Sequence, residues 1–215
     1  LRWMISNWWI IKVTTLSKQK WRCNMHQDLD SALCAKYPKI FRDRRAPMNQ
    51  TCMCWGFEHG DGWFNIINQM CANIQHHIDW TRKQRLNALL YNRALTRAIN
   101  GDMSTYGRLS KWQQNQIDDD LKDPEPQLRH VPEACPQVVA IQVKEKFGTL
   151  RFYYSGGDDI VSGIERMADS MSAVMCEKCG APGRSRRGGW IRTLCDTHAE
   201  EEGYYTTEAE EATLP

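Results

Sequence analysis

Four residues near the C-terminus have the types and spacing of a metal site. A Cys-x2-Cys pair is followed, after fifteen residues, by a Cys-x2-His pair, so the candidate ligands are Cys176, Cys179, Cys195 and His198. Two intervening residues let one tight turn direct both side chains at the same ion, and three cysteines with one histidine make the closed set that structural zinc sites use. A disulfide would leave the histidine without a role. The sequence therefore predicts one structural zinc ion.

The chain between the two ligand pairs is basic. It contains four arginines and an aromatic ring: Arg184, Arg186, Arg187, Trp190 and Arg192. Such side chains can hold phosphates and stack on a base, which makes the loop a candidate nucleic-acid contact. Alternatively, these residues are solvated on an exposed loop, and the arginines neutralise the negative charge of a zinc ion bound by three thiolates. The sequence alone leaves both interpretations open.

A second group of metal-ligating residue types lies upstream, at Cys52, Cys54, His59 and Cys71. Cys-x-Cys is a less usual pair of zinc ligands. Cys71 falls on the apolar face of an expected helix, where buried free cysteines are common. We therefore expect core or interface cysteines here, and no second metal ion.

Groups for acid–base chemistry are few. His59 with Asp61 and the pair Asp158–Asp159 are the candidates, although the aspartate pair is explained more simply as a helix start, where carboxylates favour the positive end of the helix dipole. The sequence contains no nucleophile elbow, Walker A loop, HExxH motif or dinucleotide-binding fingerprint. A protein that is not an enzyme is the favoured interpretation, and a small enzyme acting on nucleic acid through these residues is the alternative.

The elements that must position these residues indicate an α+β fold. We expect a long helical arm, a unit made of a β-hairpin and a helix, and a C-terminal zinc ribbon. Apolar residues recur at helical spacing from Trp63 to Ile78, and helical composition continues to a cap at Asn100-Gly101, with a break near Trp80 as one option. Shorter helices are expected at 27–37 and 106–121.

The segment that leads into the metal site should be a hairpin followed by a helix. Two runs with strand composition, 138–144 and 150–154, flank a turn at Gly148. A helix then begins at Asp158 or Asp159. Its apolar face consists of Ile160, Ile164, Met167 and Met171, and the helix delivers the chain to Cys176.

Composition is that of an ordinary soluble protein, with 41% hydrophobic and 25% charged residues. The net charge of +2 combines +5 in residues 1–24, −6 in residues 200–215 and +3 between them, which argues against a strongly basic nucleic-acid binder. The apolar run Trp8–Ile11 is too short to span a bilayer, so we expect no membrane partner. No secretory signal is recognisable, and in a reducing cytosol paired cysteines indicate metal and not disulfides.

Several motifs beyond the ligands are distinctive. They are KYPKIF at 36–41, CWGFEHGDGW at 54–63, VKEKFGTLRFY at 143–153 and CEKCGAPG at 176–183. Together they resemble a group of small phage and prophage proteins over residues 25–199. The resemblance implies a phage or prophage origin and the cytoplasm of a bacterial host, and it brings no established activity.

These observations divide the chain into five parts. Residues 1–24 read as an upstream extension or a short amphipathic segment, 25–122 as mainly helical, 123–136 as a Pro-rich linker or crossover loop, 137–199 as the hairpin, helix and zinc ribbon, and 200–215 as an acidic disordered tail. The expected function is that of a phage accessory protein, a zinc-stapled binding module for a host or phage protein or nucleic acid. The sequence does not specify that partner or the oligomeric state.

Overall fold

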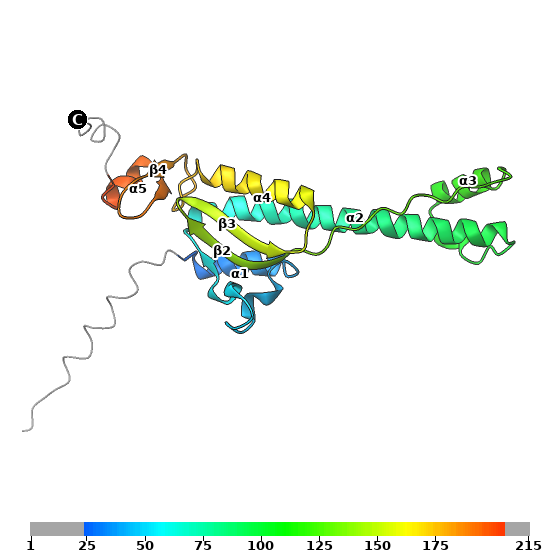
Figure 1. Cartoon of the computed structure of the whole chain (residues 1–215), viewed down its shortest axis with the longest axis horizontal. Coiled ribbons are helices and arrows are strands. Elements are labelled where there is room, and N and C mark those ends of the chain that lie inside the picture. The colour runs from blue at the N-terminus through cyan, green and yellow to red at the C-terminus, as the bar shows by residue number, and fades with distance from the viewer. Residues whose placement is uncertain (1–23, 205–215) are drawn as a thin grey trace, which may run out of the picture.

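The computed structural model describes residues 24–204, and it shows a small sheet packed among helices with one long helical arm (Figure 1). Strands β1 (Phe57–Glu58), β2 (Val139–Lys146) and β3 (Thr149–Ser155) form a sheet in that order, with β1 parallel and β3 antiparallel to β2. The expected mixture of a long helix with a small amount of strand is confirmed. The predicted extension, except for Asn24, lies outside the described residues.

The β2–β3 hairpin closes through a two-residue turn. Phe147 and Gly148 occupy the turn with φ angles of 55° and 80°. Positive φ at both central residues is the requirement of a type I′ turn, whose twist matches that of the two strands it joins. The Gly148 N–H also donates to the Glu145 carboxylate at 2.6 Å. The hairpin predicted around Gly148 is therefore confirmed.

The arm is one unbroken helix, α2 (Phe64–Ile99). The break considered near Trp80 does not occur, and 36 residues at 1.5 Å each give a length of about 54 Å. The main core ends along this helix at Ile78. Beyond it, Tyr91 and Leu95 pack against Ile117 of α3 (Lys111–Asp120) in a separate small cluster. Figure 1 shows this distal half projecting away from the rest of the molecule.

A helix was expected over 106–121, and the structure divides that segment. Residues Tyr106–Arg108 form a 3-10 turn, and α3 begins only after Ser110. Ser110 caps the helix reciprocally with Gln113, which satisfies two backbone N–H groups that would otherwise lack partners. The capping box thus fixes the start of α3 five residues later than the predicted boundary.

The Pro-rich segment returns along α2 as an ordered crossover. Asn92 exchanges two hydrogen bonds with the backbone of Arg129, at 2.8 and 2.9 Å. Arg85 donates to the Pro132 carbonyl oxygen at 3.0 Å. Because side chains of α2 supply these partners, a segment without helix or strand is held in place from the tip of the arm back to the sheet.

One apolar cluster unites the elements on both sides of this crossover. It contains residues of α1 (Gln27–Lys36), the proximal half of α2, the sheet and α4 (Asp159–Ser172). Asp158 caps α4 by accepting from the N–H groups of Ile160 and Val161, both at 3.1 Å, as the sequence suggested. The residues that α4 buries are Val161, Ala168 and Ser172.

The apolar face predicted for this last helix is therefore not its core face. Ile160, Met167 and Met171 are 56%, 58% and 43% exposed. Periodicity identified the apolar stripe correctly, but burial falls on smaller residues about a quarter-turn away.

The C-terminal unit is short and built around the predicted ligands. Strands β4 (Arg184–Arg186) and β5 (Arg192–Leu194) pair antiparallel, and α5 (Asp196–Glu201) follows directly. Residues 200–204 are placed, so the tail boundary predicted at Glu200 is too early, and the rest of that tail lies beyond the described chain. Among residues 24–204, no helix combines the length and apolar character needed to cross a membrane.

Candidate metal centre

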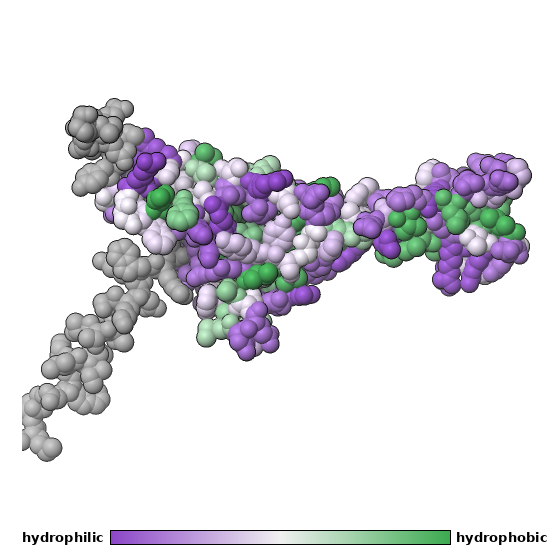
Figure 2. Space-filling view, viewed as in Figure 1, coloured by the Kyte–Doolittle hydropathy of each residue, from purple (hydrophilic) through white to green (hydrophobic). Residues whose placement is uncertain are grey.

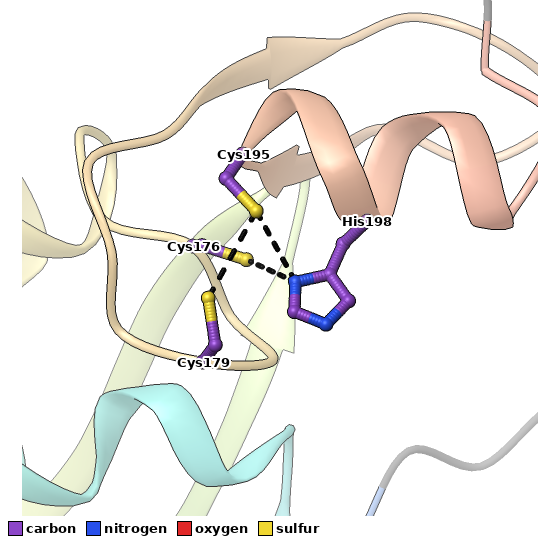
Figure 3. Close-up of side chains that lie close together, drawn as sticks. All are labelled: Cys176, Cys179, Cys195 and His198. Carbon is purple, nitrogen blue, oxygen red and sulfur yellow. Dashed lines mark hydrogen bonds between the residues drawn. The ribbon is translucent and has the colours of Figure 1, made fainter.

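The structure brings the four predicted ligands together, close enough to hold a metal ion (Figure 3). Their ligand atoms all lie within 4.8 Å of one another. The Cys179 and Cys195 sulfurs are 3.9 Å apart, and His198 Nδ1 lies 3.5 Å from the Cys176 sulfur and 3.2 Å from that of Cys195. A disulfide requires about 2.05 Å between sulfurs, so this arrangement is not one.

The first ligand pair sits on a tight backbone turn. Gly180 donates its N–H to the Cys176 carbonyl oxygen at 2.8 Å and adopts a φ of +76°, which glycine reaches without steric cost. Burial alone would raise the pKa of Cys176. Backbone N–H groups of Cys195, Cys179 and Lys178 outweigh it and lower that pKa to about 7 from an ordinary 9.0. A turn that favours thiolate is suited to a cation.

A second turn, far away in sequence, packs against this one. The Gly62 N–H donates to the Glu177 carbonyl oxygen at 2.8 Å, and the Gly60 N–H donates to the Glu177 carboxylate at 3.0 Å. A Cβ on Gly62 would lie 2.5 Å from the Gly180 nitrogen and 2.7 Å from that of Cys179. Only glycine permits this approach. The CWGFEHGDGW motif therefore packs directly against the turn at residues 176–180, which we call the metal turn.

The same contact ties the metal centre to the start of α2. The indole of Trp63, the last residue before that helix, is fully buried and donates to the Met175 carbonyl oxygen at 2.9 Å. Met175 immediately precedes the first ligand. The metal turn, the end of α4 and the beginning of the long arm therefore meet at one place.

The ligand pairs are joined by a buried ion-pair network. Arg192 on β5 contacts the carboxylate of Glu177 at 2.9 Å and that of Glu202 at 2.5 Å. Glu177 is 1% exposed, and its burial raises its pKa against the opposing effect of the arginine. Lys178 also pairs with Glu202. This network holds the chain after α5 against the metal turn.

The basic loop is accordingly less exposed than predicted. Arg186 is 4% exposed and pairs with Asp196, which Arg184 also contacts, at 3.1 Å. Together with the burial of Arg192, this corrects the expectation that all these arginines face outward. Internal carboxylates supply partners that no spacing rule reveals.

Arg184 is exposed although it pairs with Asp196, and two further residues of the predicted set lie at the surface. Arg187 is exposed, and Trp190 is 62% exposed with its indole N–H donating to the Glu145 carboxylate at 2.9 Å. An exposed cation and ring are thus all that the loop offers to a nucleic acid without breaking internal ion pairs.

The upstream cysteines and His59 have separate surroundings. His59 is fully buried between the rings of Phe57 and Trp63, and its Nδ1 lies 2.8 Å from the Gly60 carbonyl oxygen. Burial lowers its pKa to about 4 from 6.5. The Cys54 thiol donates to a backbone carbonyl, and Cys71 is buried in the core. Within residues 24–204, these side chains do not gather into a group that could hold an ion.

The acid–base candidates also have separate hydrogen-bond partners. Asp61 accepts the His26 N–H at 2.6 Å, while Asp158 caps α4 and contacts His77 Nε2 at 2.7 Å. In the described chain, no hydrogen bond or ion pair joins His59 or Asp61 to Asp158 or Asp159. Cys135 completes a second compact group with His77 and Asp158, which sequence reasoning missed because its three members are far apart in the chain.

Comparison of the chain with models of protein families, with curated proteins and with solved structures found no match.

Proposed function

We propose that the ion is zinc and that the centre is a structural zinc ribbon. Zinc binds cysteine sulfur at about 2.3 Å and histidine nitrogen at about 2.0 Å, so a tetrahedral site has ligand separations of about 3.8 Å for two sulfurs and about 3.5 Å for sulfur and nitrogen. The separations of 3.9 Å between two sulfurs and 3.5 Å between sulfur and nitrogen fit these values, and the third, 3.2 Å between Cys195 and His198, is slightly shorter. Four protein ligands leave no open position for catalysis.

We further infer that the chain is a binding module of phage or prophage origin, acting in the cytoplasm of a bacterial host. The phage origin is supported by the resemblance of the sequence motifs. The observation that carries the binding part of this proposal is the distal arm, made of α2 from residue 79 onward, the following loop and α3, which contributes nothing to the main core and exposes large apolar side chains. They are Leu86, Leu89, Ile99, Met103 and Trp112, each between 44% and 65% exposed. Figure 2 shows hydrophobic residues gathered on the distal part of the arm, between hydrophilic ones.

The charge beside the exposed leucines of α2 indicates the chemistry of the partner, whereas α3 ends in Asp118, Asp119 and Asp120. Between Asp79 and Asp102, helix α2 carries cations and no carboxylate: Arg82, Lys83, Arg85, Arg93 and Arg97. Lys83 and Arg93 are exposed beside Leu86 and Leu89. A surface that alternates apolar and basic residues favours a protein partner with an apolar patch bordered by carboxylates.

A nucleic-acid partner has less support. Its predicted contact was the arginine loop, and Arg186 and Arg192 in that loop are committed to internal ion pairs. The alternating leucines of the arm also suit a protein surface better than a row of phosphates. We therefore favour protein over nucleic acid as the ligand of the arm.

The test compares three baits in cells that carry the phage. The baits are the unmodified chain, an arm variant with Leu86→Asp and Leu89→Asp, and a control with Met48→Asp. Met48 is 71% exposed and lies away from the arm. We expect one host or phage protein to bind the first and third baits and not the arm variant. The captured protein, once purified, must bind the purified baits in the same order.

Two outcomes would count against this proposal. Equal binding of the purified partner to the arm variant would exclude the arm as the docking surface. Loss of capture after nuclease treatment would show that nucleic acid, and not protein, is the ligand. All three baits should contain equal zinc, which controls for folding.

A further inference from the structure

An apolar stripe runs the full length of α4 and onward to the metal centre. Its members recur at alternating intervals of four and three residues: Ile160, Ile164, Met167, Met171 and Val174. Four of the five are between 43% and 64% exposed, and Ile164 is half-buried. This interval is the seam of a coiled coil, through which a helix packs against another helix. The protein displays two heptads of such a seam to solvent.

The stripe borders a hollow between α4 and α2. The hollow has a volume of about 360 Å³ and is lined by Ile164 together with Asn73, His76, His77 and Trp80 of α2. Trp80, at the edge of the hollow, is 53% exposed. Gly163 flanks the stripe, and a Cβ placed there would meet nothing within 4 Å. A second helix could therefore approach α4 closely without displacing any described side chain.

The stripe itself carries no charge. Of the charged residues on α4, Asp169 pairs with Arg151 of β3 at 2.6 Å, so it faces the sheet and not the stripe. Glu165 is half-buried. Asp159 and Arg166 immediately precede stripe residues, so their side chains project from a different side of the helix. An uncharged apolar row can meet a copy of itself without bringing like charges together, which an isologous two-fold interface requires.

We propose that a second copy of this chain covers this surface, with α4 packed against α4 about a two-fold axis. The stripe and Trp80 expose roughly 500 Å² of apolar surface, as large as the patches that mark interaction sites on monomers. Two such surfaces bury about 1,000 Å², which reaches the lower bound for a specific protein–protein interface. The dimer is therefore concentration-dependent. It is independent of the partner proposed for the arm, because it uses a different face.

Sedimentation of the zinc-loaded 215-residue chain tests the proposal. The apparent mass should rise from 25.0 kDa to twice that value as the concentration increases. Met167→Lys places an unpaired charge at the centre of the interface and should weaken self-association by at least about tenfold. Leu86→Lys, at a similarly exposed position on the arm, should dimerise like the unmodified chain. A chain that stays monomeric at all concentrations, or an unchanged Met167→Lys variant, overturns the proposal.

Cross-linking through introduced cysteines locates the interface independently. Ile160→Cys, Met167→Cys and Val174→Cys are treated separately with a short thiol cross-linker, and the unmodified chain gives the background from native thiols. Equal cross-linking at all three sites supports parallel helices, and cross-linking at Met167→Cys alone supports antiparallel ones. Cross-linking at none of them, in a chain that still dimerises, places the interface elsewhere and refutes this assignment.

Discussion

Replacing Gly62 by alanine tests whether the metal turn requires the close backbone contact that glycine permits at this position. The added Cβ would lie 2.5 Å from the Gly180 nitrogen and 2.7 Å from the Cys179 nitrogen, and closer still to the Cys176 carbonyl oxygen. All three atoms are backbone, so no flexible side chain can yield. Overpacking of this kind costs about 1–3 kcal/mol, and contact with rigid backbone places the change at the upper end.

The strain should appear in metal affinity as well as in stability. If the turn relaxes only when the ion leaves, about 3 kcal/mol corresponds to roughly a hundredfold weaker binding of zinc. Competition with a chelating dye measures the affinity, and urea unfolding of the loaded protein measures the stability. Gly189→Ala is the matched control, because a Cβ there meets nothing within 4 Å. Unaltered zinc affinity and an unaltered urea midpoint in Gly62→Ala would refute the reasoning.

Three further changes probe the surroundings of the centre. Arg192→Met leaves Glu177 buried without its cation and should lower the free energy of unfolding by about 3–5 kcal/mol, whereas adding Glu177→Gln should restore much of the loss. His59 is neutral when folded, with a pKa of about 4, and protonates below about 6.5 when unfolded. The buried neutral histidine therefore contributes its full stabilisation above pH 6.5, and the free energy of unfolding decreases by about 3 kcal/mol as the pH falls to 4. Urea midpoints from pH 7 to 4.5 should depend on pH less steeply in His59→Gln, and identical profiles would contradict this. Asp158→Ala removes the cap of α4 and should cost about 1–2 kcal/mol in thermal or urea unfolding, against less than about 0.5 kcal/mol for the neighbouring Asp159→Ala.

The features that sequence predicted well are local. The spacing of four ligands, the turn at Gly148 and the aspartate before α4 each depend on a few consecutive residues, and the structure places all of them as expected. The helical period from Trp63 onward also predicted α2, because a long repeat overrides individual exceptions. These patterns record the geometry of the chain over short distances.

The features that sequence could not predict depend on partners far away in the chain. Strand β1 has only two residues and exists because it pairs with β2, 86 positions later at Phe57 and Val143. The burial of Arg192 follows from carboxylates on two other segments. Neither pairing leaves a periodic signal in the sequence.

Helix α4 shows a different limit. Its period identified an apolar stripe, but an amphipathic pattern has the same form whether the stripe faces the core or another chain. In this protein the core takes Val161 and Ala168, and the stripe that includes Met167 is left at the surface. Periodicity alone therefore predicts which residues share a face, and only the fold shows what that face contacts.

Cys176, Cys179, Cys195 and His198 lie close enough to hold a metal ion, and we propose that this ion is zinc. X-ray absorption of the purified chain, with elemental analysis, tests this central proposal most directly. We predict one zinc per chain, with three sulfur neighbours at about 2.3 Å and one nitrogen at about 2.0 Å, and loss of the zinc in Cys195→Ser. A metal-free folded chain, or a zinc ion with a different set of neighbours, would contradict the account.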